Sequence, residues 1–532
     1  MNYYMKHNIK TIGSLLILAT VLVSVISCNK FLDRKPLSAT YADINQGALE
    51  SQSLGLYNTL RWAGFSTLPW IDFNSIRDDD AQKGSSLTDG AEINAEFETF
   101  KYTKDDWATN TYWNDHYSMI NLCNTELHWA DSLKATDPAS LRNIGEAKFF
   151  RAYSFFELVK AYGQVPLINF YYTNPADGVK PKATIAQIYA QIDSDLDSAS
   201  KLLPLNWVVA GTNTYPGRLT SGAANTLWAQ TYLFRQQWSN VVALCNKVIN
   251  SGQYSLATNF YDIWKDGLNG AGKNGPESIF EMQSFVGAAG ANWNATQWGT
   301  SQNVRQGGAD VSWNLGWGWN TPTSVLNNAW DNSDPRKNMT ILFSGQSDGG
   351  PSQGGYGAVV PPYNAASPGS AGTLDQPFWN KKVYSDPSMR AYTGQINSSG
   401  GADWINHRIL RYADVLLMLA EASNELGDGA TAAANLEKIR ARARGGNSSV
   451  LPPIPFVSQA QMRTAIKNER RWEFAMEGYR FYDLVRWTPA ADGIDANTVL
   501  SPLGYTPRCQ YYPIPQKAID LSGGVLVQNP LW

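Results

Sequence analysis

The sequence predicts a mainly α-helical protein, a tetratricopeptide-like array of helix pairs that carries a large, loop-rich insertion lobe. Three observations support this fold class. Apolar residues recur at helical spacing through most of the chain. Alanine and large aromatic residues occupy positions where paired helices must approach closely. One long interval, 264–405, is instead rich in Gly, Asn, Ser, Pro and Trp and shows few helical patterns.

Helical periodicity defines the expected elements in chain order. The third helix should end at Gly163, before Pro166, and Thr184 is the expected N-cap of the fourth. The expected helices are 47–62, 113–133, 141–162, 185–203, 219–235, 238–250, 408–426, 429–443 and 458–487.

Three segments are expected to form adjacent helix–turn–helix units: 141–203, 219–250 and 408–443. Ala229 near Tyr232 is typical of tetratricopeptide-type pairs, as is the Ala-Glu-Ala run at 420–422. Such pairs cannot bury their apolar faces alone, so they stack into a curved array. Most aromatic residues at helical spacing are therefore interpreted as core.

The N-terminus reads as an export signal, residues 1–27. A short basic region precedes an apolar run, Ile12 to Ile26, which is shorter than the roughly 20 residues of a membrane-spanning helix. The run ends in Val25-Ile26-Ser27-Cys28, which resembles a bacterial lipoprotein box. Cys28 would then carry lipid and anchor the protein to a membrane. The alternative is an ordinary secretory signal with an incidental cysteine.

Three further cysteines, Cys123, Cys245 and Cys509, are too few for a disulfide framework. Cys123 and Cys245 lie in helical patterns and are expected to be small buried apolar residues. The fold must therefore depend on its hydrophobic core.

Composition narrows the class of ligand. The net charge is −3, which argues against a nucleic-acid partner. Aromatic residues make up 12% of the chain, including 20 Trp, whereas charged residues make up only 17%. A Trp-rich, charge-poor surface suits a neutral ligand with flat apolar faces, and sugars fit that description. Few aromatics occur in disordered segments, so we expect the lobe at 264–405 to be folded and to carry binding function.

Several motifs resemble those of the SusD/RagB family of outer-membrane nutrient-binding lipoproteins. The similarity covers nearly the whole mature chain, and the motifs occur in the family's order. They are Cys28–Asp33 (CNKFLD), Trp113-Asn114, Ile120–Thr125 (INLCNT), Asp334–Arg336 (DPR), Arg411–Ala422 (RYADVLLMLAEA), Glu469–Trp487 (ERRWEFAMEGYRFYDLVRW), Pro513–Pro515 and Gln528–Pro530.

The resemblance implies both a fold and a role. Family members are lipid-anchored at the surface of Gram-negative bacteria, where they bind glycans and pass them to a SusC-type TonB-dependent transporter. Their fold has four tetratricopeptide-like helix pairs that support a loop-rich, ligand-binding region, and they are not enzymes. The expected regions are a signal peptide (1–27), an N-terminal SusD-like region (28–263), the aromatic-rich lobe (264–405) and a C-terminal SusD/RagB region (406–532).

The sequence motifs and the histidine spacing offer little support for catalysis or for a cofactor. The four histidines, at positions 7, 116, 128 and 407, stand far apart and lack the spacing of a zinc site. No phosphate-binding GxxxxGK[ST] motif is present, and no GxSxG lies between a strand and a helix pattern. No motif points to a glycosidase carboxylate pair, although acids are plentiful.

Two charged segments need an interpretation. Asp78-Asp79-Asp80 could bind calcium, but without EF-hand spacing it is interpreted as a solvated acidic turn or an acceptor for sugar hydroxyls. In the last helix, Glu477/Arg480 and Arg480/Asp483 have the spacing of intrahelical pairs. We interpret that helix as part of an ion network that locks the last helices to the array.

A sugar site needs an aromatic platform beside planar polar side chains. Two regions qualify, 78–107 and 293–319. If the Trp317-Gly318-Trp319 segment is extended, both indoles lie on one face. We hypothesise that Trp313, Trp317 or Trp319 stacks on sugar, although each Trp could equally anchor its loop. The candidate ligand-binding residues are Asp79, Asp80, Lys83, Phe100, Tyr102, Trp107, Trp293, Trp298, Trp313, Trp317 and Trp319.

Three alternatives remain open beside a surface glycan-binding lipoprotein. The chain could be a docking lid for the transporter with little sugar affinity, a binder of peptide nutrients, or an enzyme. Retention on a glycan would distinguish a glycan-binding protein from a docking lid. Turnover of a retained polysaccharide would identify an enzyme.

Overall fold

The computed structural model describes residues 49–86, 89–90, 96–268, 270–286, 295–306, 312–392 and 403–532. The expected signal peptide, Cys28 and Trp293 lie outside these ranges. Within them, none of the helices combines the length and the apolarity needed to cross a bilayer.

The described chain is mostly helical. Its α-helices are α3 (Glu50–Thr59), α4 (Ala63–Ser66), α5 (Leu68–Asn74), α7 (Trp107–Ser132), α8 (Pro138–Tyr162), α9 (Ile185–Leu202), α10 (Ser221–Phe234), α11 (Trp238–Asn250), α12 (Trp298–Gln302), α13 (Ser324–Ala329), α14 (Pro335–Thr340), α15 (Tyr412–Glu425), α16 (Gly429–Arg444), α17 (Gln459–Phe474), α18 (Arg480–Arg486), α19 (Ala496–Val499) and α20 (Gln516–Leu521).

The strands are short, and each described sheet is a single antiparallel pair: β1 with β5, β2 with β3, β4 with β8, and β6 with β7. Their bounds are β1 (Ala81–Gly84), β2 (Val208–Val209), β3 (Thr212–Asn213), β4 (Ser278–Met282), β5 (Trp319–Pro322), β6 (Ile341–Phe343), β7 (Phe378–Asn380) and β8 (His407–Arg411).

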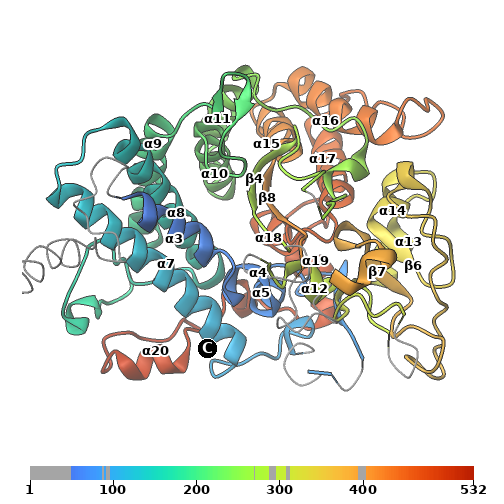
Figure 1. Ribbon diagram of the computed structural model, residues 1–532, viewed down its shortest axis with the longest axis horizontal. Coiled ribbons are helices and arrows are strands. Elements are labelled where there is room, and N and C mark those ends of the chain that lie inside the picture. Colours follow the sequence, from blue (N-terminus) through green and yellow to red (C-terminus); the bar gives the residue numbers. More distant parts are fainter. Residues whose placement is uncertain are drawn as a thin grey trace, which may run out of the picture.

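Stacked helix pairs form the body of the molecule, as expected from the sequence. In Figure 1, α7, α8 and α9 occupy one side, α10, α11, α15, α16 and α17 follow along the top, and the lobe with α13, α14, β6 and β7 lies at the opposite side. The expected signals at helix ends are confirmed. Thr184 caps α9 through a capping box with Gln187, and Gly163 ends α8 with a φ of +70°.

Two expected helices differ from the structure. Residues 407–411 form strand β8 instead of the first turn of a helix, because they pair with β4 across the body. The helix expected at 458–487 is two helices, α17 and α18, separated at 475–479. Met476 and Gly478 both have positive φ there, which an α-helix does not allow.

One large hydrophobic core unites the N-terminal helices, part of the lobe and the C-terminal segment. Phe73 of α5 stacks on Tyr512, with ring centroids 3.7 Å apart, and on Tyr112 of α7 at 4.0 Å. The side-chain amide of Asn529 donates to the carbonyls of Tyr162 and Tyr512, each at 2.8 Å. The chain end is therefore built into the core. The described cysteines, Cys123, Cys245 and Cys509, are buried and free, as expected for the first two.

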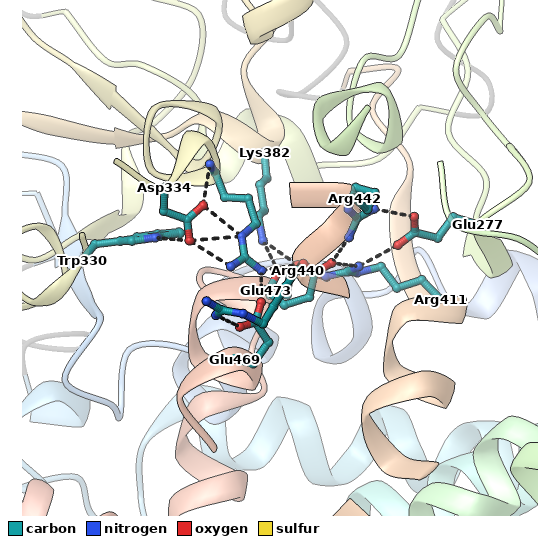
Figure 2. A network of polar contacts seen from close by, with 11 residues as sticks. Glu277, Trp330, Asp334, Lys382, Arg411, Arg440, Arg442, Glu469 and Glu473 are labelled. Atoms are coloured by element: carbon teal, nitrogen blue, oxygen red, sulfur yellow. Dashed lines mark hydrogen bonds and ion pairs between the residues drawn. The ribbon is translucent and has the colours of Figure 1, made fainter. Parts of the chain in front are cut away.

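The lobe is tied to the body by strands and by a buried ion network. β4 pairs with β8, and β5 pairs with β1, so lobe strands complete two-stranded sheets with segments far away in sequence. Figure 2 shows the network, in which side chains from the lobe, β8, α16 and α17 converge on Glu473.

Glu473 is the centre of this network. Its carboxylate forms ion pairs with Arg336 of the lobe, Arg411 of β8 and Arg442 of α16. Burial raises the pKa of Glu473, but the charges of Arg442, Arg411 and Arg336 outweigh burial and lower that pKa well below its usual value. The network therefore holds an ionised carboxylate in the interior.

The expected locking role of the last helices is confirmed, but neither expected intrahelical pair, Glu477/Arg480 nor Arg480/Asp483, is among the ion pairs that these described residues form. Asp483 pairs with Arg486 within α18 and with Arg470 of α17. Arg480 instead reaches Asp79, at 2.9 Å, and Glu477 pairs with Arg411. The break between α17 and α18 separates Glu477 from the helix that contains Arg480, so helical spacing does not apply to that pair.

Candidate functional site

The two regions predicted to bind sugar meet at the β1–β5 pair. In its antiparallel register, Ala81 lies opposite Pro322 and Gly84 lies opposite Trp319. The backbone N–H of Ser85 donates to the carbonyl of Gly318, which extends the pairing by one step. Chain segments more than 200 residues apart in sequence are thus joined at one place on the lobe.

Arg305 connects the loops around this strand pair. Its Nη1 donates to the hydroxyl of Ser85 and to Asp89, and its Nε lies 3.3 Å from Asp375 Oδ2. The side chain of Arg305 is 27% exposed and that of Asp89 is 41% exposed, whereas that of Asp375 is 5% exposed. Burial raises the pKa of Asp375, which the charge of Arg305 partly offsets.

Two side-chain amides extend the polar cluster. Gln376 Nε2 donates to the carbonyl of Ser85 at 2.6 Å, and Gln82 Nε2 lies 3.3 Å from Gln376 Oε1. Arg305, Asp89, Asp375, Gln82 and Gln376 therefore form a linked set of planar donors and acceptors. Side chains of this kind recognise sugar hydroxyls.

Two half-buried tryptophans lie in the segment that leads into β5. Trp313 lies parallel to Tyr384, with ring centroids 6.4 Å apart and an interplanar angle of 8°. Trp317 is half-buried, and its backbone N–H donates to the carbonyl of Thr300 at 2.7 Å. These two side chains keep part of their surface in solvent, as does Trp107, which is 39% exposed, so each has surface to offer a ligand.

The Trp317-Gly318-Trp319 segment is not fully extended. Gly318 has a φ of +75°, and β5 begins only at Trp319. The two indoles consequently differ in environment, since Trp319 is only 5% exposed and lies beneath the loop at Gly90. A Cβ on Gly318 would lie 2.8 Å from Arg305 Cβ and 2.9 Å from Trp379 Cζ3, so the glycine permits the close approach that positions Arg305.

Lys83 lies beside Trp319 and is itself largely buried. Its Nζ donates to the carbonyl of Ser86 at 2.8 Å and lies 5.0 Å from the centroid of the Trp319 ring. Burial lowers the pKa of Lys83. The structure thus brings Lys83 and Trp319 together, with both side chains packed below the polar cluster.

Asp79 and Asp80 face the C-terminal helices. Both carboxylates pair with Arg471, and Asp79 also pairs with Arg480. Asp78 is buried and accepts from the backbone N–H groups of Asp80 and Ala81. The interpretation of this segment as a solvated acidic turn is wrong, because Asp78 and Asp80 are buried and Arg471 and Arg480 pair with its carboxylates.

The remaining candidates lie elsewhere. Phe100 and Tyr102 are at most 2% exposed and pack around Arg77, whose Nη2 donates to the Tyr102 hydroxyl at 2.9 Å. Trp298 is buried and stacks on His407, with centroids 3.8 Å apart. Trp107 is the first residue of α7 and is 39% exposed. That any of these contacts ligand stays a prediction.

Sequence reasoning missed Arg305, Asp89, Asp375, Gln82 and Gln376. Arg305 and Asp89 lie close in sequence to predicted aromatic or acidic candidates, and a search for polar residues around the Trp-rich loop could have found them. Nothing in the local pattern points to Asp375 or Gln376, since only the fold brings them to Arg305.

Comparison with known proteins identifies the family. A profile described as "SusD family" matches residues 276–532, and a second, "Starch-binding associating with outer membrane", matches residues 30–233. The two matches together span most of the chain and occur in the expected order. This chain belongs to the SusD/RagB family.

SusD-like relatives align over nearly their full length. The chain is 24% identical to "SusD-like protein P2" of Formosa agariphila, over 96% of both chains. It is 25% identical to a "SusD-like protein" of Bacteroides ovatus, over 89% of this chain and 82% of the relative. These alignments agree with the family assignment.

Solved structures of the SusD family share the fold. The structure titled "Laminarin binding SusD-like protein" superposes with a TM-score of 0.71 at 25% identity, covering 91% of this chain and 99% of that chain. "Surface glycan-binding protein A from Bacteroides thetaiotaomicron in complex with laminarihexaose" superposes with a TM-score of 0.69 at 22% identity, covering 90% and 98%. The SusD family thus includes proteins that bind glycans.

Proposed function

We propose that this SusD/RagB protein is a cell-surface lipoprotein that binds glycans and delivers them to a partner TonB-dependent outer-membrane transporter of the SusC type. Lipid on Cys28 would anchor it to the outer membrane, with the body facing the exterior. The protein would bind and present its ligand without breaking bonds in it.

One observation supports glycan binding most directly. The half-buried Trp313 and Trp317 lie in the segment that leads into β5, and Gly318 of that segment packs against Arg305, which pairs with Asp89 and Asp375. An indole covers the apolar face of a pyranose, while paired planar groups exchange hydrogen bonds with its hydroxyls. The cluster pairs cationic with acidic groups, so it favours a neutral saccharide.

The buried candidates would support the site from below. Trp298 and Trp319 pack beneath the loops, and Asp79 and Asp80 fasten β1 to the C-terminal helices through Arg471. We assign ligand contact to Trp313 and Trp317, and positioning of the loops to Trp319 and Lys83.

The role in transport draws support from the family. One matching profile is described as associating with the outer membrane, and relatives with the same fold are named as glycan-binding proteins. Co-purification of the lipidated protein with a SusC-type outer-membrane transporter from the same cells would test the partnership directly. A chain carrying Cys28→Ala should lose the membrane anchor.

Glycan binding is tested by affinity electrophoresis and calorimetry against a panel of neutral polysaccharides that includes laminarin. Trp313→Ala and Trp317→Ala should each weaken binding about tenfold, corresponding to about 1.4 kcal/mol. Trp62→Ala serves as the control, because it removes an indole that is 39% exposed and lies outside the β1–β5 pair.

The alternatives give different results. A docking lid without sugar affinity would be retained by no polysaccharide but would still co-purify with the transporter. A binder of peptide nutrients would be retained by peptides instead. An enzyme would release shorter products from a retained polysaccharide.

A further inference from the structure

A second pocket lies within the helical array, outside the site at β1–β5. It has a volume of about 370 Å³, within the range of small-molecule sites, and is lined by the start of α11, the end of α15, one face of α17 and the segment after α18. In Figure 1, α11, α15 and α17 lie along the top of the molecule, whereas β7 and α12 of the lobe lie lower and to the right.

Two indoles line this pocket, and both are half-buried. Trp487 is fixed in place, because its Nε1 donates to Glu421 Oε1 at 2.9 Å and Lys467 Nζ lies 5.1 Å from its ring. Trp238 begins α11, where part of its indole packs against the hydrophobic core and the half-buried side chain also lines the pocket. Trp238 can therefore offer a face to a ligand.

The charges around the pocket are matched in pairs. Arg463 pairs with Glu425 at 2.6 Å, and Lys467 pairs with Asp492 at 2.9 Å. The buried Glu421 is paired with Arg486 behind the wall. A charged ligand would have to break one of these pairs, which is costly where they are partly buried.

A neutral ligand rich in hydroxyl groups would keep every pair intact. Each paired carboxylate retains free lone pairs, and the exposed part of Arg463, whose side chain is 34% exposed, retains donors. Hydrogen bonds to charged groups are stronger than those between neutral groups. The indoles supply the apolar surface that a sugar ring needs.

We propose that this pocket is a second saccharide-binding site, with Trp238 as its stacking platform and Arg463 and Asp492 as hydroxyl partners. This proposal rests on the proposed function, since it assumes a glycan as the ligand. Two sites on one chain would bind a long polysaccharide more tightly than a short oligosaccharide, because the second contact becomes intramolecular.

The test compares Trp238→Ala and Arg463→Gln with wild type, by calorimetry with oligosaccharides and by affinity electrophoresis with the polysaccharides that retain the wild-type protein. Trp62→Ala is the matched control, because Trp62 is also a partly exposed indole at the start of a short helix. Arg463→Gln leaves both indoles in place, so it remains informative if Trp238→Ala unfolds the protein.

We expect the oligosaccharide stoichiometry to fall from two to one in Trp238→Ala, and polysaccharide affinity to fall about tenfold or more in both variants. Trp317→Ala should weaken oligosaccharide binding at the other site about tenfold and leave binding at this pocket unchanged. The proposal is overturned if wild type binds a single oligosaccharide and both variants match it, in which case the proposed function stands. Retention of wild type by no polysaccharide would overturn both proposals.

Discussion

Arg336 of the lobe and Glu473 of α17 lie 3.1 Å apart, Nη1 to Oε2, with both side chains wholly buried. The same guanidinium also pairs with Glu469, at 2.7 Å, and with Asp334, at 2.8 Å. The loop-rich lobe is thus attached to the helical array by buried charge as well as by strand pairing. This attachment gives the loops that carry the candidate site a rigid support.

Glu473→Gln should strongly destabilise the protein. The substitution leaves Arg336, Arg411 and Arg442 without their shared carboxylate in the interior, and breaking a buried ion network by removing one partner costs about 3–5 kcal/mol. Urea unfolding followed by tryptophan fluorescence measures the loss. Asp197→Asn removes the partner of Lys201 in an exposed pair and should change stability by less than about 1 kcal/mol.

Acidification should also act through Glu473. Because its pKa is lowered in the folded state, the ionised carboxylate contributes stability above its ordinary pKa of 4.5, and that contribution is lost as pH falls below this value. The free energy of unfolding of wild type should therefore decrease on acidification below about pH 4.5. The decrease should be smaller in Glu473→Gln, and an equal decrease in both proteins would contradict this assignment.

Asp403 should make stability depend on pH in the opposite sense. Burial raises the pKa of Asp403 to about 7, so the folded state favours the protonated carboxyl. Stability is then greatest below the ordinary pKa of 3.8 and falls as pH rises toward 7, by up to about 4 kcal/mol.

Asp403→Asn should remove this fall, because the amide is neutral at every pH. Its oxygen can still accept from the N–H of Ile405, and its NH₂ can face the hydroxyl of Thr300. Unfolding free energies at pH 5 and pH 8 for wild type and variant measure the effect. A fall of equal size in both would show that another group is responsible.

Gly318→Ala should weaken glycan binding. A Cβ there meets Arg305 and Trp379 at less than 3 Å, and the positive φ adds backbone strain. The displaced Arg305 would lose its contacts with Asp89 and Asp375, and we expect affinity to fall about tenfold or more.

Gly357→Ala provides the control for strain alone. Gly357 has a φ of +78°, and an added Cβ meets nothing within 4 Å. This variant should be less stable than wild type, but its affinity for glycan, measured well below its melting temperature, should be unchanged. If both variants bind glycan equally, the close approach at Gly318 does not position the site.

Arg471→Ala should lower stability and leave glycan affinity unchanged. Arg471 pairs with Asp79 and Asp80, so its removal leaves two largely buried carboxylates short of a partner. Thermal unfolding measures the first effect, and calorimetry on the folded variant measures the second. A loss of affinity without a loss of stability would assign Asp79 and Asp80 to the ligand surface instead.

Much of the helical array follows from local sequence. The capping box at Thr184 and the stop at Gly163 are short-range signals, and both are found in the structure. The errors arise where long-range contacts override local propensity. His407–Arg411 continues a helical pattern but pairs with β4, and Arg480 turns from its helical neighbours to Asp79.

The sequence by itself determined the helix pairs, the aromatic-rich lobe and the family. Hydrophobic periodicity indicates the helix pairs, composition indicates the lobe, and contiguous motifs indicate the family. Only the tertiary structure decided which indoles keep a free face and which polar groups stand beside them. Strand pairing across more than 200 residues, and the positive φ of Gly318, bring Arg305 to Ser85, Asp89 and Asp375. Such long-range contacts depend on how the whole chain packs, and no local sequence pattern predicts them.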